Sequence, residues 1–112
     1  MERLCKIREI QHNIAAFEKR FVERYGICLN EGMILCSLLK SDHGTLTSGE
    51  LSELLGLSHS NTSKVIASLE NKLLIERTFC ENDKRKMCFS LTSEGSRLIQ
   101  SVNCDELGEL PL

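Results

Sequence analysis

The sequence predicts an α+β, mostly helical protein organised around a winged helix-turn-helix with a two- to three-stranded wing sheet. Three observations predict this fold. A capping-box pattern formed by Thr47 and Glu50 opens a short apolar run that Gly56 closes. Residues 59–71 follow, with apolar side chains at helical spacing. Two strand-like runs then flank a charged turn over residues 81–85, which completes the order of helix, turn, helix and wing.

The first predicted helix covers residues 2–24, where apolar side chains recur in alternating steps of three and four. This spacing is close to that of a coiled-coil seam, and charged residues fill the other face. A helix of this length can cover its own core and also face a partner, so we expect a homodimer. The residues expected at the dimer contact are Ile7, Ile10, Ile14, Phe17 and Phe21. The alternative is that this helix packs only within its own chain.

The second predicted helix begins near Asn30, a good N-cap residue, after Gly26 has ended the first helix as its C-cap. Glu31 lies in the first turn, where the helix dipole favours a negative charge. Apolar residues on most of its sides predict that this is the central core helix. Leu46 could then form a short strand beside the wing.

A third and a fourth helix form the predicted helix-turn-helix, and Ser58 caps the fourth. The residues expected to face the core are Leu51, Leu54 and Leu55 in the third helix and Thr62, Val65, Ile66, Leu69 and Leu73 in the fourth. The first two turns of the fourth helix carry short polar residues and no acid on the opposite side. This pattern suits a helix that lies in a nucleic-acid groove, and a solvated helix face is the alternative. The residues in question are Ser60, Asn61, Ser63 and Lys64.

The wing is predicted from strands at residues 75–80 and 86–91, the second with apolar side chains at every other position. Thr92 caps a last helix over residues 93–102. The expected organisation is a single domain, 1–112, made of a dimerisation helix (1–25), a winged-helix core (29–102) and an acidic tail (103–112).

The charge distribution favours a nucleic-acid partner, although the formal net charge is −2. Residues 58–97 hold seven Lys/Arg and five Asp/Glu, whereas residues 98–112 hold three acidic residues and no basic ones. The positive excess therefore belongs to the helix-turn-helix and the wing. No run of about 18 apolar residues occurs, and the N-terminus is too charged for a secretory signal. We expect no membrane span and a cytoplasmic location.

Six cysteines are many for a chain of 112 residues. No two have the C-x-x-C spacing of a zinc or redox site, and no secretion signal favours a disulfide framework. We therefore expect reduced thiols that pack as small hydrophobic groups. A minor alternative is a redox-switched wing, because Cys80 and Cys88 could lie near each other on one face of the hairpin.

No arrangement of catalytic or metal-binding residues is found. The three histidines, His12, His43 and His59, are scattered, and there is no Gly-rich phosphate loop and no zinc-protease helix motif. We therefore expect neither an enzyme nor a cofactor or metal.

Two segments resemble the MarR family of bacterial winged-helix transcription regulators, over about residues 29–100. The segment LTSGELSELLGLSHSNTSKVIASLENKLLIER looks like the helix-turn-helix of that family. The segment DKRKMCFSLTSEG looks like its wing and following helix, where an Asp, an Arg two residues later and a downstream Leu-Thr are typical. Here these residues are Asp83, Arg85, Leu91 and Thr92.

The resemblance implies a homodimeric repressor that binds palindromic double-stranded DNA, with the recognition helix in the major groove and the wing in the adjacent minor groove. It implies that Ser60, Asn61, Ser63 and Lys64 face bases or phosphates. In the wing, it implies that Arg85 enters the minor groove, Asp83 orients Arg85, and Lys84 and Lys86 contact phosphates.

Three further implications follow from the resemblance. The family usually pairs a long C-terminal helix with its first helix at the dimer contact. Here only about ten residues follow the last predicted helix, so the first helix is expected to carry the dimer. A small-molecule effector between the dimer helices and the DNA-binding lobe is left open. So is oxidation of Cys5, because some members sense peroxides through a cysteine in this region. The alternative function is a winged-helix protein-interaction module without DNA affinity, favoured by the net charge of −2 and the acidic tail.

Overall fold

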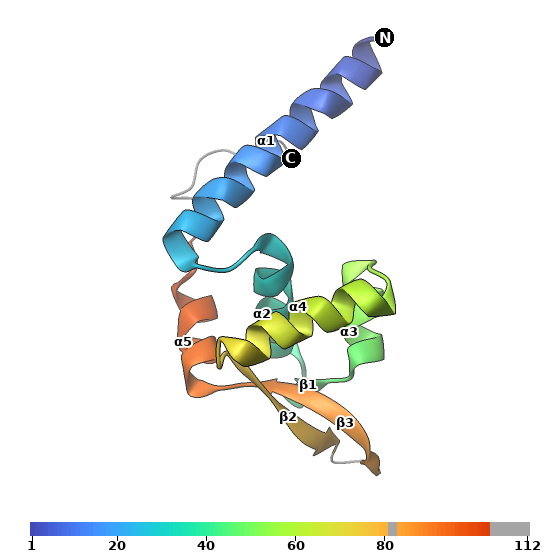
Figure 1. Ribbon diagram of the computed structural model, residues 1–112, viewed down its shortest axis with the longest axis vertical. Coiled ribbons are helices and arrows are strands. Elements are labelled where there is room, and N and C mark those ends of the chain that lie inside the picture. Colours follow the sequence, from blue (N-terminus) through green and yellow to red (C-terminus); the bar gives the residue numbers. More distant parts are fainter. Residues whose placement is uncertain (81–82, 104–112) are drawn as a thin grey trace. The chain divides into compact units, whose positions relative to one another are not determined.

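A computed structural model describes residues 1–80 and 83–103, with the side chains of residues 83 and 84 outside the description. Its elements are α1 (Glu2–Tyr25), α2 (Leu29–Lys40), β1 (Thr45–Leu46), α3 (Ser48–Leu55), α4 (His59–Asn71), β2 (Ile75–Cys80), β3 (Asp83–Leu91) and α5 (Ser93–Ser101) (Figure 1). This is the predicted winged helix-turn-helix. Two compact units are distinguished, one with Met1–Leu29 and the chain from Val102 onward, the other with Asn30–Ser101. They are described one at a time.

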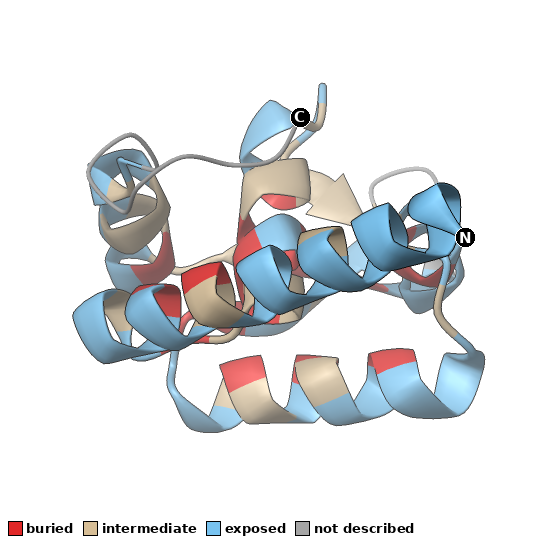
Figure 2. Ribbon diagram, turned by 90° about the horizontal axis from the view of Figure 1, so that it is seen from above, coloured by how far each residue is buried: buried red, intermediate tan, exposed pale blue. Residues whose placement is uncertain are grey.

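The first unit contains α1, which runs over the predicted residues. Gly26 ends it with a left-handed φ of 73°, and its N–H donates to the Val22 carbonyl at 2.8 Å. The first turns are exposed, as the pale helix at the N label of Figure 2 shows. Ile7 and Ile14 are 51% and 44% exposed, whereas Phe17 is 3% exposed. The apolar seam of α1 therefore has an exposed N-terminal part and a buried C-terminal part.

In the second unit, α2 is the central core helix, as predicted. Ile34 and Leu35 are fully buried, and Leu38 is 1% exposed. The helix begins at Leu29, so Asn30 lies in its first turn and the prediction that Asn30 caps the helix is wrong. Helix starts are among the least determined features of a sequence pattern, because the cap depends on backbone geometry as well as on residue type.

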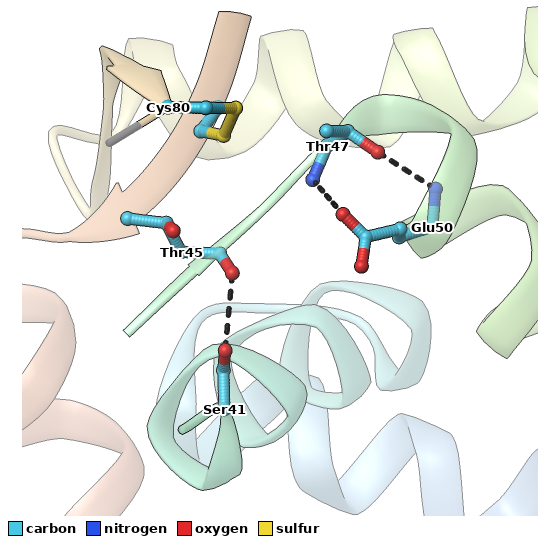
Figure 3. The surroundings of a disulfide bond; sticks show 6 residues. Ser41, Thr45, Thr47, Glu50 and Cys80 are labelled. Carbon is cyan, nitrogen blue, oxygen red and sulfur yellow. Dashed lines mark hydrogen bonds between the residues drawn. A yellow bond between two sulfur atoms is a disulfide. The ribbon is translucent and has the colours of Figure 1, made fainter. Parts of the chain in front are cut away.

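The start of α3 has the predicted capping box. The Thr47 side chain accepts from the Glu50 N–H at 3.1 Å, and the Glu50 carboxylate accepts from the Thr47 N–H at 3.1 Å (Figure 3). The prediction that Leu54 faces the core is wrong, because Leu54 is 63% exposed and Ser52 is buried beside Leu51. Along a helix of 3.6 residues per turn, the inward side is centred between positions 51, 52 and 55, which turns position 54 outward.

Helix α4 has the predicted bounds and the predicted cap, because Ser58 Oγ accepts from the Asn61 N–H at 3.1 Å. The prediction that Leu73 faces the core is wrong, since Leu73 is 67% exposed and has a φ of 61°. This left-handed residue ends the helix as a Schellman motif. The Leu74 N–H donates to the Leu69 carbonyl at 3.1 Å, and the Leu73 N–H donates to the Glu70 carbonyl at 3.0 Å. The change of direction turns Leu74, not Leu73, into the core.

The three strands form an antiparallel sheet in the order β1-β3-β2, with Leu46 opposite Phe89 and Ile75 opposite Leu91. Strand β3 begins at Asp83, three residues before the predicted start at Lys86. The predicted alternation also fails, because Cys88 and Phe89 are both buried. Both residues lie in the regular part of the ladder, opposite Thr78 and Arg77, so their side chains are on opposite faces of the strand, and Cys88 is bonded to Cys80. Residues 81 and 82 of the predicted turn lie outside the described residues.

The cysteines differ from the prediction. Cys80 and Cys88 form a disulfide, with their Cα atoms 5.4 Å apart, so the expectation of reduced thiols is wrong for this pair. Cys5 is exposed and does not pack as a core residue, whereas Cys28 and Cys36 are half-buried. Cys104 lies outside the described residues. The pair was hard to predict because Cys88 is opposite Thr78, not Cys80, in the strand ladder.

The last helix, α5, is attached to the end of α4 through Thr92. The Thr92 hydroxyl donates to the Leu73 carbonyl at 2.7 Å and accepts from the Gly95 N–H at 3.0 Å. The Thr92 N–H donates to the Leu74 carbonyl at 3.1 Å. Among the helices that the structure describes, none is long and apolar enough to cross a membrane.

Candidate nucleic-acid interface

The outer face of α4 carries the residues that the sequence singled out. Ser60, Asn61, Ser63 and Lys64 are all exposed, and the first turn holds no acidic residue. Short hydroxyl and amide groups can donate to or accept from base edges and phosphates. The positive end of the helix dipole is at the same end of α4, where it attracts anions. This face therefore offers hydrogen-bonding groups without a local negative charge that would repel a polyanion.

Buried contacts hold the other side of α4. Ile66 and Leu69 are 3% and 0% exposed. Thr62 is 1% exposed, and its hydroxyl donates to the Ser58 carbonyl at 2.8 Å. The turn before α4 is fixed in a similar way, because the buried Ser52 hydroxyl donates to the Leu57 carbonyl at 2.7 Å. The orientation of the exposed polar face is thus set by packing and by satisfied backbone groups.

A buried carboxylate anchors the C-terminal half of α4, and the sequence pattern did not reveal this role. Glu31 of α2 is 4% exposed and accepts from Lys72 Nζ at 2.9 Å and from the Ser68 hydroxyl at 2.9 Å. A buried charge is costly unless it is paired and hydrogen-bonded, as it is here. The sequence indicated only the dipole position of Glu31. Its partners are 37 and 41 residues away, so no local signal links them.

The wing contributes basic residues at its far end. Arg85 and Lys86 are exposed on β3. The side chains of Asp83 and Lys84 lie outside the description, so the expected orienting role of Asp83 stays a prediction. Along the ladder, Met87 is opposite Phe79 and the next pair is Asp83 opposite Cys80. The three basic residues 84–86 therefore lie between two successive pairs of the ladder, whose partners on β2 are the adjacent residues Phe79 and Cys80.

Arg77 connects the recognition helix to the wing, and the sequence analysis missed it. Arg77 Nε lies 2.9 Å from one carboxylate oxygen of Glu70 on α4, and its second nitrogen lies 3.2 Å from the other. Its guanidinium carbon also lies 5.5 Å from the ring centroid of Phe89 on β3. The hydrogen bonds to Glu70, and then the negative charge of Glu70, raise the pKa of Arg77 above its ordinary value. Because a guanidinium is cationic at physiological pH, the paired Arg77 neutralises the charge of Glu70.

A hollow of about 200 Å³ is lined by residues of both α4 and the wing. Its lining includes Ser63 of α4, Arg77 of β2 and Met87 of β3, with Ser48 at the start of α3. Ser63 is one of the predicted recognition residues, so the outer face of α4 adjoins the root of the wing on the same side of this unit. A rod-shaped ligand that contacted the outer face of α4 would therefore also pass close to the wing.

The comparisons with known proteins agree with this geometry. The model of the MarR family matches residues 26–86. The chain is 31% identical over 95 residues to the HTH-type transcriptional regulator PrsX of Escherichia coli, which covers 85% of this chain and 55% of that protein. It is 28% identical over 102 residues to the transcriptional repressor MprA of E. coli K12, covering 91% of this chain and 57% of that protein. The chain thus spans about half the length of these curated relatives.

Two solved structures are similar in fold. The Staphylococcus aureus MepR–DNA complex gives a TM-score of 0.67 at 25% identity, covering 85% of this chain and 77% of that chain. The MarR family regulator AbsC of Streptomyces coelicolor gives a TM-score of 0.77 at 27% identity, covering 88% of this chain and 69% of that chain.

Proposed function

We propose, from the premise that this chain belongs to the MarR family, that it is a sequence-specific transcriptional regulator that binds double-stranded DNA. In this proposal α4 lies in the major groove, and the wing reaches the adjacent minor groove. The observation that carries it is the hollow that joins Ser63 of α4 to Arg77 and Met87 of the wing. The helix face and the wing are thereby side by side, as contact with neighbouring grooves requires. The likeness to a MepR–DNA complex supports the same ligand.

The contacts divide by chemistry. Ser60, Asn61 and Ser63 have the short hydrogen-bonding side chains that reach base edges, and Lys64 carries the charge that contacts a phosphate. Arg85 is assigned to the minor groove, with Lys84 and Lys86 at the flanking phosphates. Occupation of a promoter by such a protein blocks the polymerase, so we assign the chain a repressor role and no catalytic one.

The proposal includes a homodimer that binds a palindromic operator. The exposed part of the α1 seam supports it, because Ile7 and Ile14 are about half exposed at helical spacing. Sedimentation at micromolar concentration should show a dimer for the wild-type chain and a monomer for Ile7→Glu combined with Ile14→Glu. His12→Glu is the matched control, since His12 is exposed on the charged side of the same helix. A wild-type monomer, or an unaltered dimer in the double variant, would refute the assignment.

The DNA-binding proposal is tested by fluorescence anisotropy on duplexes that the protein selects from a random library. Arg85→Ala should weaken binding and lower the slope of log affinity against log salt by about one. Arg97→Ala is the matched control, because Arg97 is exposed on α5, away from the wing tip in Figure 1. Binding that is absent at low salt, or that does not weaken as salt rises, would favour the protein-interaction module instead. Equal effects of the two substitutions would refute the wing assignment.

A further inference from the structure

The hollow between α4 and the wing lies where a DNA backbone would have to pass. In the proposed function α4 occupies the major groove and the wing occupies the adjacent minor groove. Two neighbouring grooves of a duplex are separated by one sugar–phosphate backbone. That backbone must therefore cross the surface between Ser63 of α4 and Met87 of the wing, and both residues line the hollow. The charged group that the backbone presents there is a phosphate.

The size and lining of the hollow suit one small polar group. Its volume is about 200 Å³, whereas pockets for drug-sized ligands usually measure roughly 300–1,000 Å³. Ile66 of α4 and Phe89 of β3 form part of its wall and are 3% and 5% exposed, so core packing fixes that part. The other residues of the lining are exposed, and three of the four are polar: Ser48, Ser63, Arg77 and Met87.

Strand pairing places the Ser48 hydroxyl beside the wing. Leu46 of β1 is opposite Phe89 of β3, and Ser48 follows two residues later as the first residue of α3. The capping box of Thr47 and Glu50 fixes the backbone at this point. Ser48 is exposed, so its hydroxyl can donate to an acceptor on a ligand. Serine hydroxyls are common donors to DNA phosphates.

Arg77 brings a guanidinium to the same hollow from β2. A guanidinium has five N–H groups, and the carboxylate of Glu70 accepts from Nε and from one terminal nitrogen. The remaining N–H groups can donate to a second acceptor, because the Arg77 side chain is 57% exposed. The planar donor group of arginine also matches the geometry of a phosphate. Ser48 and Arg77 therefore offer one neutral and one charged donor to the hollow.

Glu70 lowers the charge that this site offers to a polyanion. Its carboxylate lies 2.9 Å from Arg77 Nε, so the pair has no net charge. We propose that the hollow is a subsite for one backbone phosphate of double-stranded DNA, that Ser48 and Arg77 donate to this phosphate, and that Glu70 limits the affinity by neutralising Arg77. This inference rests on the proposed function, and it adds Ser48, Arg77 and Glu70 to the residues that determine DNA affinity.

The two kinds of donor predict different dependence on salt. Ser48→Ala removes a neutral hydrogen bond, so binding should weaken roughly threefold while the slope of log affinity against log salt stays the same. Glu70→Gln leaves Arg77 beside a neutral partner, so one more cation meets the phosphate. Binding should then tighten on the order of fivefold at 0.1 M salt, and the slope should steepen by about one.

The experiment measures the anisotropy of selected fluorescent duplexes with the full chain. Each duplex of a series carries one neutral methylphosphonate in place of one phosphate, at successive positions along the backbone. At the position that meets the hollow, the neutral group should weaken binding of the wild type but not weaken Ser48→Ala further. At the same position it should abolish the gain of Glu70→Gln. This gain should also be absent when Arg77→Gln is added.

Two matched controls separate this site from general changes in charge and helix structure. Ser93→Ala also removes an exposed serine at the first position of a helix, α5, outside the lining of the hollow. Glu76→Gln removes the same charge from β2, but Glu76 is adjacent to Arg77 in the strand and therefore points to its other face. Neither control should depend on any one methylphosphonate. Urea denaturation verifies that every variant is folded.

The outcomes distinguish this inference from the proposed function. DNA binding by the wild type without a position at which the methylphosphonate and Ser48→Ala are coupled would overturn the subsite and leave the DNA-binding proposal standing. A gain for Glu70→Gln no larger than that for Glu76→Gln would overturn the role of Glu70. No binding to any duplex, by the wild type or by Glu70→Gln, would overturn the proposed function and this inference together.

Discussion

Replacing Gly95 by alanine should destabilise the second unit, because α5 crosses the backbone at Leu74 too closely for a side chain. Gly95 is the buried residue of α5. A Cβ atom built on it would lie 2.9 Å from the Leu74 carbonyl carbon and closer still to the carbonyl oxygen. Non-bonded carbon atoms prefer about 3.5–4.0 Å. The obstacle is backbone, which cannot rotate aside, so α5 must move away from Leu74.

The expected cost follows from what that movement disturbs. Overfilling a packed site typically costs about 1–3 kcal/mol. The Thr92 N–H donates to the Leu74 carbonyl at 3.1 Å, and loss of such a hydrogen bond costs about 1 kcal/mol. Alanine in place of glycine stabilises a helix by roughly 0.5–1 kcal/mol, which offsets part of this cost. The free energy of unfolding of Gly95→Ala should therefore fall by about 2–3 kcal/mol.

Urea denaturation followed by circular dichroism measures this change. Protein concentration and redox buffer must be fixed, because the proposed dimer and the disulfide would both contribute to stability. Gly49→Ala is the matched control. Gly49 is also in the first turn of a helix, and its nearest Cβ contact would be Thr47 Oγ1 at 3.8 Å, so this variant should gain roughly 0.5 kcal/mol. A Gly95→Ala variant as stable as wild type, or a change in stability equal to that of Gly49→Ala, would refute the reasoning.

Two further predictions concern polar contacts of the helix-turn-helix, and both use the same urea denaturation. Lys72→Met should lower the free energy of unfolding by about 2 kcal/mol, because it leaves the carboxylate of Glu31 buried without its cation. The figure allows for the Lys72 side chain, which is itself 39% exposed. Arg77→Met, which breaks the exposed pair with Glu70, should shift the urea midpoint less, and the opposite order would contradict the assigned burial. Thr47→Ala should cost about 1 kcal/mol by removing the capping box, and no change would show that Glu50 alone caps α3.

Helix bounds were predictable where a local group fixes them. Ser58 and Thr47 satisfy N–H groups three residues later, and Gly26 supplies a left-handed backbone. Each signal lies within four residues of the helix end that it sets. Leu54 and Leu73 were placed wrongly because apolar spacing cannot show which side of a short helix is covered, or where a Schellman turn changes the direction of the chain.

The contacts that the sequence did not reveal are long-range or depend on register. Glu31 and Lys72 are 41 residues apart, and each alone has an ordinary local interpretation. Cys80 and Cys88 are close in sequence, but regular pairing places Thr78 opposite Cys88. Their disulfide depends on the irregular strand pairing at the end of β2, which cannot be recognised from the residue pattern. The exposure of the candidate residues on α4 was therefore predictable from local spacing, but the groups that hold α4 were not.

The ion pairs of Glu70 and Glu31 also explain how a chain of net charge −2 can present a surface that suits a polyanion. Glu70 is the sole acidic residue in the sequence of α4, and Arg77 of the wing neutralises it. Glu31, which underlies the same helix, is buried and neutralised by Lys72. Both carboxylates thus contribute structure without adding an uncompensated negative charge beside Lys64 and Arg85. Since exposed charges interact over about 10 Å at 0.1 M salt, the local balance decides binding, not the sum over the chain.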